Sequence, residues 1–127
     1  MAAKVIFLFL FFFNFSKVFA NEQIKILDKD QNTAEIKIID KITSRLNEVK
    51  LNIKTVKKIK DFEIYIEKCV VDERKGFRET SALIQIKDIK NKTKDKVFLF
   101  NDWMFATNPA VNEVEHPNYD IWLSKCS

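Results

Sequence analysis

The chain has 127 residues and a formal net charge of +4, and 46% of its residues are hydrophobic. A chain of this length is expected to form one domain around a single core. Its two cysteines and one histidine are fewer than the four nitrogen or sulfur ligands of a structural zinc site. We therefore expect no metal site, and we predict no cofactor.

The first 20 residues have the layout of a secretory signal peptide. A lysine at position 4 precedes an almost wholly apolar run over residues 5–15, as in a charged n-region followed by a hydrophobic h-region. Val18 and Ala20 then place small side chains at the −3 and −1 positions of a cleavage site. The alternative, a membrane anchor, needs about 20 apolar residues, and Lys17 ends this run well short of that. We predict cleavage after Ala20, export to the periplasm and no transmembrane span in the mature protein.

Cleavage changes the composition of the chain that is left, residues 21–127. Seven of the twelve phenylalanines and two of the basic residues precede the cut, so 20 basic and 18 acidic side chains give the mature chain a charge of +2. The lysines of residues 50–60 suggest a basic patch, but acidic residues follow them directly. Because so small a net charge gives little attraction to nucleic acid, we expect a single small domain that does not bind nucleic acid.

Both cysteines, Cys69 and Cys126, lie in the mature chain. In an exported protein an even number of cysteines is typical of disulfides, and two cysteines allow one pairing. For the loop that this bridge closes, the chain-entropy model gives a stabilisation of about 4 kcal/mol. Two free thiols are the alternative. We predict the disulfide.

From Glu22 onward, apolar residues mostly alternate with polar ones, which is the pattern of strands with one face on a core. In one such stretch Phe62, Ile64 and Ile66 share a face. The predicted strands cover residues 33–39, 46–55, 61–71, 81–89, 96–100 and 120–125. Polar, turn-forming stretches lie at 28–32, 57–60, 72–76 and 91–95. We predict an all-β domain, a small antiparallel β-sandwich or partly closed barrel.

Residues 108–117 break the strand rhythm. Asn108 is a suitable N-cap, Pro109 fits the first position of a helix, and Pro117 ends the run. We predict one short helix or helical turn here, between an aromatic strand at 103–105 and another at 119–122.

Residues 103–122 also carry a long motif that resembles a known family. They read W-M-F-A-T-N-P-A-V-N-E-V-E-H-P-N-Y-D-I-W, and Cys126 follows. This is similar to the C-terminal signature of the DUF2155 family of exported proteins of Alphaproteobacteria, W-M-F-A-S-S-P-A-L-N-A-L-E-H-P-V-Y-D-V-W followed by cysteine. The stretches D-K-I-T at 40–43 and I-E-K-C at 66–69 resemble the family's opening D-K-x-T and its first cysteine. The resemblance covers residues 40–126 and implies an exported protein, with no assigned activity and no catalytic residues to transfer.

A Ser-His-Asp triad is the strongest catalytic reading of this motif. His116, Asp120 and Ser124 are spaced at fours, which would stack them on one face of a helix. Pro117 breaks such a helix, however, and residues 120–124 have a strand pattern, so we predict no catalytic residues. His116 is more simply a turn histidine near a helix C-terminus.

Five residues are candidates for binding: Trp103, Phe105, His116, Tyr119 and Trp122. Aromatic side chains at alternate positions can line a groove for sugar rings or peptides, although large aromatics are more often part of a core. We therefore expect a non-enzymatic periplasmic module that binds an envelope protein or supports an envelope assembly. The alternative is a module that binds cell-wall glycan or peptide through its C-terminal aromatic segment, and an unrecognised enzyme is a third hypothesis.

Overall fold

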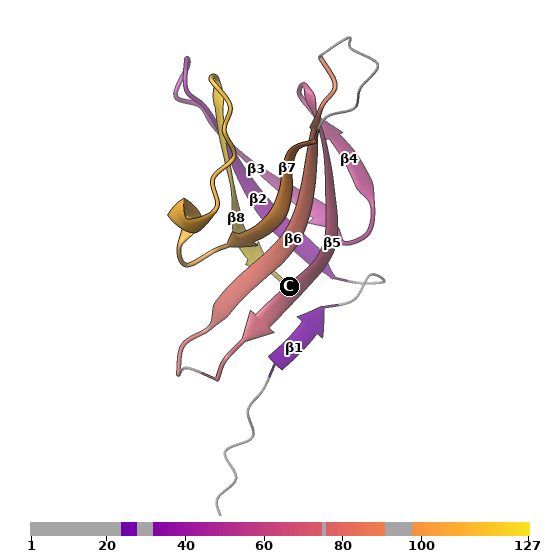
Figure 1. The fold of residues 1–127 in the computed structure, drawn as a ribbon, viewed down its shortest axis with the longest axis vertical. Helices are drawn as coiled ribbons and strands as arrows, with labels where there is room; N and C mark the ends of the chain where they lie inside the picture. The colour runs from indigo at the N-terminus through magenta and orange to yellow at the C-terminus, as the bar shows by residue number, and fades with distance from the viewer. Residues whose placement is uncertain (1–23, 28–31, 75, 91–97) are drawn as a thin grey trace, which may run out of the picture.

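The structure, a computed structural model, describes residues 24–27, 32–74, 76–90 and 98–127 (Figure 1). The predicted signal peptide lies outside these residues, as do residues 28–31 and 91–95 of the predicted turns. The described elements are β1 (Ile24–Leu27), β2 (Thr33–Asp40), β3 (Leu46–Asn52), β4 (Val56–Ile59), β5 (Phe62–Asp72), β6 (Glu79–Asp88), β7 (Phe98–Phe105), the 3-10 turn η2 (Pro109–Val111) and β8 (Tyr119–Cys126).

The strands form two antiparallel sheets that face each other (Figure 1). Sheet A has the order β1-β5-β6-β7, and β4 also pairs with β5. Sheet B has the order β3-β2-β8. The prediction of an all-β fold is confirmed, and of its two forms the sandwich is correct, because the sheets do not close into a barrel. In the described residues, no helix is long and apolar enough to cross a bilayer.

The core lies between the sheets and follows from the alternation of the sequence. In β5 and β6 every second side chain is buried, for example Ile64 against Ile86 in the same ladder. A slip of one residue would turn these side chains to water, so burial fixes the register. The side chains with 0 to 1% exposure include Ile36, Ile38, Leu51, Ile53, Phe62, Ile64, Ile66, Ile84, Ile86 and Leu123.

β5 pairs with three other strands of sheet A, namely β1, β4 and β6. One edge of β5 pairs with β6, and the ladder shifts register between Ile66 and Lys68, where Glu67 is an extra residue. The other edge is shared by β4, opposite Phe62 to Tyr65, and β1, opposite Cys69 to Asp72. Two short strands therefore complete one long edge.

The disulfide prediction is confirmed. Cys69 of β5 and Cys126 of β8 are bonded, with 6.5 Å between their Cα atoms, and at 0% and 2% exposure both are buried. The bridge joins sheet A to sheet B.

Several details of the sequence prediction are wrong or incomplete. The strand predicted over 46–55 ends at Asn52, the backbone turns through Lys54 at a φ of 63°, and the lysines predicted as a turn form β4. Of the predicted short helix or helical turn, the turn is correct, because Pro109–Val111 form a single 3-10 turn; the Asn108 side chain makes no capping hydrogen bond. The structure also adds β1, and it joins the strand predicted to end at residue 100 with the aromatic strand predicted at 103–105 into one strand, β7.

Candidate functional site

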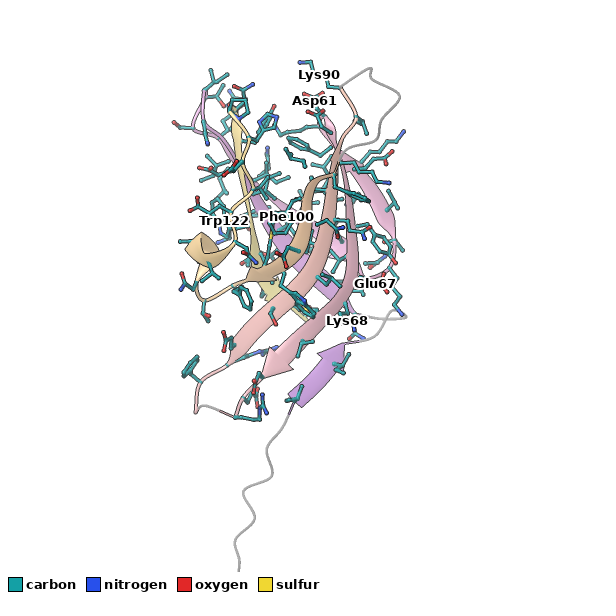
Figure 2. The ribbon with its side chains drawn as sticks, viewed as in Figure 1. Asp61, Glu67, Lys68, Lys90, Phe100 and Trp122 are labelled. Atoms are coloured by element: carbon teal, nitrogen blue, oxygen red, sulfur yellow. A yellow bond between two sulfur atoms is a disulfide. The ribbon has the colours of Figure 1, made fainter. Side chains whose placement is uncertain are left out.

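The five candidate binding residues lie in three separate places rather than along one groove. All five are half-buried, and none belongs to the fully buried core, although Tyr119 packs against it. Trp103 and Phe105 project from the outer face of sheet A, because Met104 between them is buried. Trp122 projects from β8 on sheet B (Figure 2). His116 and Tyr119 lie at one end of the sandwich.

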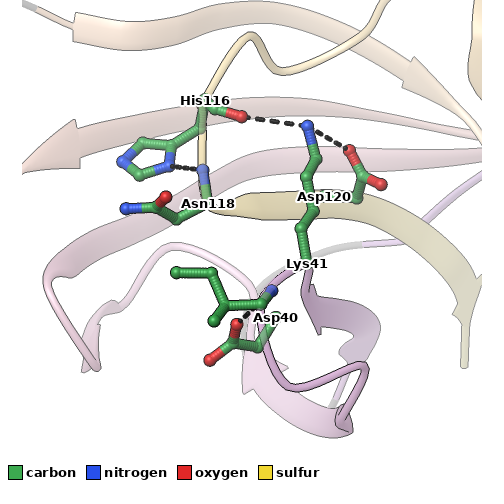
Figure 3. A network of polar contacts seen from close by, with 6 residues as sticks. Asp40, Lys41, His116, Asn118 and Asp120 are labelled. Atoms are coloured by element: carbon green, nitrogen blue, oxygen red, sulfur yellow. Dashed lines mark hydrogen bonds and ion pairs between the residues drawn. The ribbon is translucent and has the colours of Figure 1, made fainter.

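That end carries a polar network, which we call the loop-end network: Asp40, Lys41, His116, Asn118 and Asp120 (Figure 3). The β2–β8 ladder ends with Asp40 opposite Tyr119, so the D-K-I-T turn meets the segment before β8. The Lys41 ammonium donates to the His116 carbonyl oxygen at 3.0 Å and lies 3.3 Å from Asp120 Oδ1. The Lys41 N–H donates to the Asn118 carbonyl at 2.8 Å.

Asp40 holds the turn itself. Its Oδ1 accepts hydrogen bonds from the N–H groups of Ile42 at 2.9 Å and Thr43 at 3.2 Å. These two backbone donors, Ile42 first, favour the charged carboxylate and lower the pKa of Asp40 below its ordinary value. The Asp40 carbonyl also accepts the N–H of Ser44 at 2.7 Å, where φ is +59°. The carboxylate therefore caps backbone rather than facing a ligand.

His116 is held by its ring. Its Nδ1 accepts the Asn118 N–H at 3.0 Å, which places the proton of the neutral imidazole on Nε2. The ring packs edge-on against Phe62 with 5.3 Å between centroids, and Tyr119 packs edge-on against the same phenylalanine at 5.2 Å. These contacts are those of a packed turn histidine.

The contacts do not form the triad considered above. In a triad the aspartate orients the histidine through Nδ1–H, whereas here Nδ1 of His116 is an acceptor. Asp120 instead pairs with Lys41. No group of three or more His, Cys, Asp or Glu side chains within the described ranges is placed to hold a metal ion.

A depression of about 400 Å³ lies beside the loop-end network. Its lining is Lys41, Glu113, Val114, Glu115, His116, Pro117 and Asp120. The cation and one of the three carboxylates on this lining are paired with each other. This pair connects the turn after β2 to the start of β8.

The segment between β7 and β8, residues 106–118, is pinned at several points; we call it the signature loop. Asn112 Nδ2 donates to the Trp103 carbonyl at 2.8 Å. Val114 is buried, at 6% exposure, and the end of the loop is held by Lys41. Asn112 and Lys41 were not predicted as site residues from the sequence, although both stand within the quoted motifs, and Phe62 was predicted only as part of a strand face. Much of the signature therefore serves to fix this loop.

The outer face of sheet A is different, because apolar side chains gather on it. Residues opposite each other in antiparallel strands project to one face, and the ladders place Ile26, Val70, Ser81 and Phe105 in one row. The next row holds Lys68, Leu83 and Trp103, and Figure 2 labels Lys68. We define the apolar band as Ile24, Ile26, Val70, Leu83, Trp103 and Phe105.

The exposed part of this band is on β1, where Ile24 is 49% and Ile26 is 65% exposed. Of these residues, Trp103 and Phe105 were predicted from the sequence as binding residues, whereas Ile26, Val70 and Leu83 were not. The positions of these residues in the sequence do not predict the apolar band, because the band forms only when strands distant in sequence pair.

A second hollow on the same face, of about 250 Å³, is lined by Val56, Glu63, Tyr65, Gln85 and Lys87. The Tyr65 hydroxyl donates to Glu67 Oε2 at 2.8 Å, and this hydrogen bond raises the pKa of Tyr65. The hydroxyl is thus engaged within the protein.

Comparisons with known proteins agree with the motif resemblance. The chain is 26% identical over 98 residues to the uncharacterized protein RP359 of Rickettsia prowazekii (strain Madrid E), which covers 77% of this chain and 63% of that protein. The chain thus spans less than two thirds of that relative's length. No solved structure matches this chain. The model of the family DUF2155, described as an uncharacterized protein conserved in bacteria, matches residues 34–126, and the chain belongs to this family.

Proposed function

We propose that the mature chain is an exported, non-enzymatic module that binds another protein of the bacterial envelope through the apolar band. The observation that carries the proposal is the band itself. An antiparallel sheet with one face on the core normally presents a polar face to water. Here Ile24 and Ile26 of β1, about half exposed or more, lie beside half-buried Val70 of β5. The outer face continues across β6 and β7 with half-buried leucine, tryptophan and phenylalanine side chains. Contiguous exposed apolar surface is typical of interaction sites.

The side chains of the band suit a protein partner. Tryptophan is enriched among the residues that dominate binding energy, and such residues cluster at the centre of an interface with neighbours that exclude water. Trp103 and Leu83 are opposite each other in the ladder, and the aliphatic side chains of β1 lie toward one end of the rows. The band therefore runs from aromatic side chains on the edge strand β7, through Leu83 and Val70, to aliphatic side chains on β1.

The buried bridge between Cys69 and Cys126 supports the export part of the proposal. Structural disulfides persist in oxidising compartments and are rare in the cytoplasm of mesophiles. The signal-like segment over residues 1–20 points to the same compartment, the periplasm.

The loop-end network supports the non-enzymatic part. Its charged and hydrogen-bonding groups contact one another or the backbone: Lys41 with His116 and Asp120, and Asp40 with its own turn. A nucleophile or general base needs its reactive atom directed toward a substrate. The proposal assigns these residues to holding the fold.

Affinity capture with a crosslinker from the native envelope tests the proposal. The mature protein is compared with a variant that carries Ile26→Ser and Leu83→Ser. Because these changes remove apolar contact area from the band alone, we expect the wild-type protein to enrich a defined envelope protein and the variant to lose it. Binding of purified partner to both forms should then differ by at least about tenfold, as for the loss of two contacts of about 1 kcal/mol each.

The matched control is Ile42→Ser. It removes an isoleucine of 76% exposure from the turn between β2 and β3, outside the band. It should bind as the wild type does. Equal binding by the band variant, or an equal loss in the control, would contradict the assignment of the band.

A second candidate function is the binding of cell-wall glycan or peptide. It is favoured by Trp103 and Phe105, which project from the same face of β7 two residues apart, since flat aromatic faces stack on sugar rings. Co-sedimentation with purified cell-wall sacculi tests it, using Trp103→Ala against the control Trp122→Ala on sheet B. Loss in the first variant alone, with the fold intact, supports glycan binding. Absence of wild-type co-sedimentation eliminates it.

A further inference from the structure

β7 is an edge strand with an unusually apolar sequence. It is the last strand in the order of sheet A, and it reads F-L-F-N-D-W-M-F, with Asn101 and Asp102 as its polar residues. An unpaired edge presents N–H and C=O groups to which another strand can add. Short apolar segments of high β-propensity with few charges are the most prone to such pairing.

The register shows which backbone groups of β7 face away from the sheet. The Ala106 N–H donates to the Thr80 carbonyl of the neighbouring strand at 2.9 Å, and the ladder continues with Met104 opposite Ala82. In an antiparallel pair, successive residues direct their backbone groups to alternate sides. The N–H and C=O of Trp103 therefore point outward, at the middle of the exposed edge.

Both of these outward groups are occupied by side chains. The Trp103 N–H donates to Asp102 Oδ1 at 2.7 Å, and the Trp103 C=O accepts a hydrogen bond from Asn112 Nδ2 at 2.8 Å. Asn112 comes from the signature loop, so the loop places an amide where an incoming strand would place its own N–H.

The same device recurs on the edges of sheet B. On β3, the carbonyl of Lys50 accepts from Lys57 Nζ at 3.1 Å and that of Asn52 accepts from Thr55 Oγ1 at 2.7 Å. On β8, the Cys126 carbonyl accepts from Arg78 Nη2 at 3.3 Å. At Trp103 both the backbone donor and the backbone acceptor are engaged.

We propose that Asp102 and Asn112 block the edge of β7 against strand addition by a second copy of this chain. A two-fold pairing of β7 with itself, centred on residue 102, would place Leu99 opposite Phe105 and Phe100 opposite Met104 of the second copy. It would also place the two Asp102 carboxylates directly opposite each other, and like charges at this position are destabilising. Asp102 thus acts twice, by engaging Trp103 and by its charge, and the proposal does not depend on the function proposed above.

Analytical ultracentrifugation of the mature protein over a range of concentrations tests the block. The wild type should be monomeric, and the double variant Asp102→Ala/Asn112→Ala should associate at a concentration lower by about tenfold or more, since two backbone groups become free to pair. Hydrogen exchange at the Trp103 amide should slow in the associated form. A wild type that already pairs through β7, or a folded double variant that stays monomeric where the wild type does, would overturn the proposal.

Three further variants separate the contributions of Asp102 and Asn112 and test where the pairing takes place. Asp102→Asn keeps an acceptor for the Trp103 N–H but removes the charge, and Asn112→Asp keeps the size of the side chain but removes the donor; each should produce a smaller shift than the double variant. Adding Asn101→Pro, which lacks an outward N–H on the same edge, should return the double variant to the monomer. Association that persists with this proline uses another surface and refutes the proposal.

Discussion

The β2–β8 ladder ends in two different ways. At one end Thr33 and Ser127 exchange two backbone hydrogen bonds of 2.8 Å, and the neighbouring Cys126 is bonded to Cys69. At the other end Lys41 joins the turn of β2 to the signature loop through exposed polar contacts. The first closure is covalent and buried, whereas the second is polar and open to water, so redox conditions act on one and pH and salt on the other.

The largest loss of stability should come from removing the disulfide between Cys69 and Cys126. Cys69→Ala with Cys126→Ala removes the constraint on the unfolded chain, and we expect the free energy of unfolding to fall by about 4 kcal/mol. Urea denaturation of the variant and of the oxidised wild type measures the difference. A loss below about 1 kcal/mol would contradict the stabilisation assigned to the bridge.

Removing the Lys41 contacts at the polar end should lower the free energy of unfolding by a smaller amount. Lys41→Met keeps the aliphatic stem and removes the contacts of the ammonium with His116 and Asp120, so we expect a loss of about 1 kcal/mol, discounted for exposure. The loss should shrink in 1 M salt, since the charges are screened. The control Lys58→Met, at an exposed position on β4, should change stability less. An equal loss in both would remove the special role of Lys41.

The polar end should also respond to acid through Asp40. Because its pKa is lowered in the folded state, the carboxylate contributes stability that is present above its unfolded pKa of about 3.9 and is lost as pH falls through the folded value. Asp40→Asn should therefore be less stable than the wild type at pH 7, and the difference should close as the pH is lowered below 4. Urea denaturation at a series of pH values measures this difference. A constant difference across these pH values would contradict the role assigned to the carboxylate.

The smallest effect on stability should come from a residue at neither end. Ile26→Ser alters a side chain of 65% exposure, and we expect the free energy of unfolding to change by less than about 0.5 kcal/mol. Thermal and urea denaturation check this. A large loss would show that the apolar band is part of the supporting structure and not a free surface.

The strands that could be predicted from the sequence are those whose alternation is set by burial. β2, β5 and β6 have strict alternation of buried and half-buried residues over most of their length, and each was predicted to within two residues at either end. β4 was predicted as a turn because its Val-Lys-Lys-Ile sequence is short and charged. Its strand conformation depends on pairing with β5, which local sequence does not report.

The candidate site was less predictable than the fold. Four aromatic candidates are close in sequence: Trp103, Phe105, Tyr119 and Trp122. The pleat of the strands and the signature loop place them on different faces of the molecule. The apolar band joins residues of β1, β5, β6 and β7, so it depends on the order of strands in the sheet. Asn112 could not be identified because its role rests on a single hydrogen bond to a distant backbone carbonyl.

The central place of β2 in sheet B has a consequence for the order in which the chain assembles. β5, β6 and β7 follow one another along the chain and pair as neighbours, whereas β2 takes one of its two neighbours, β8, from much later in the sequence. Since distant contacts cost more loop-closure entropy and form more slowly, we expect β8 to be the last strand to join. In a chain that is made from its N-terminus, the Cys69 thiol is present before Cys126, and during this interval an oxidant or a folding catalyst could reach it.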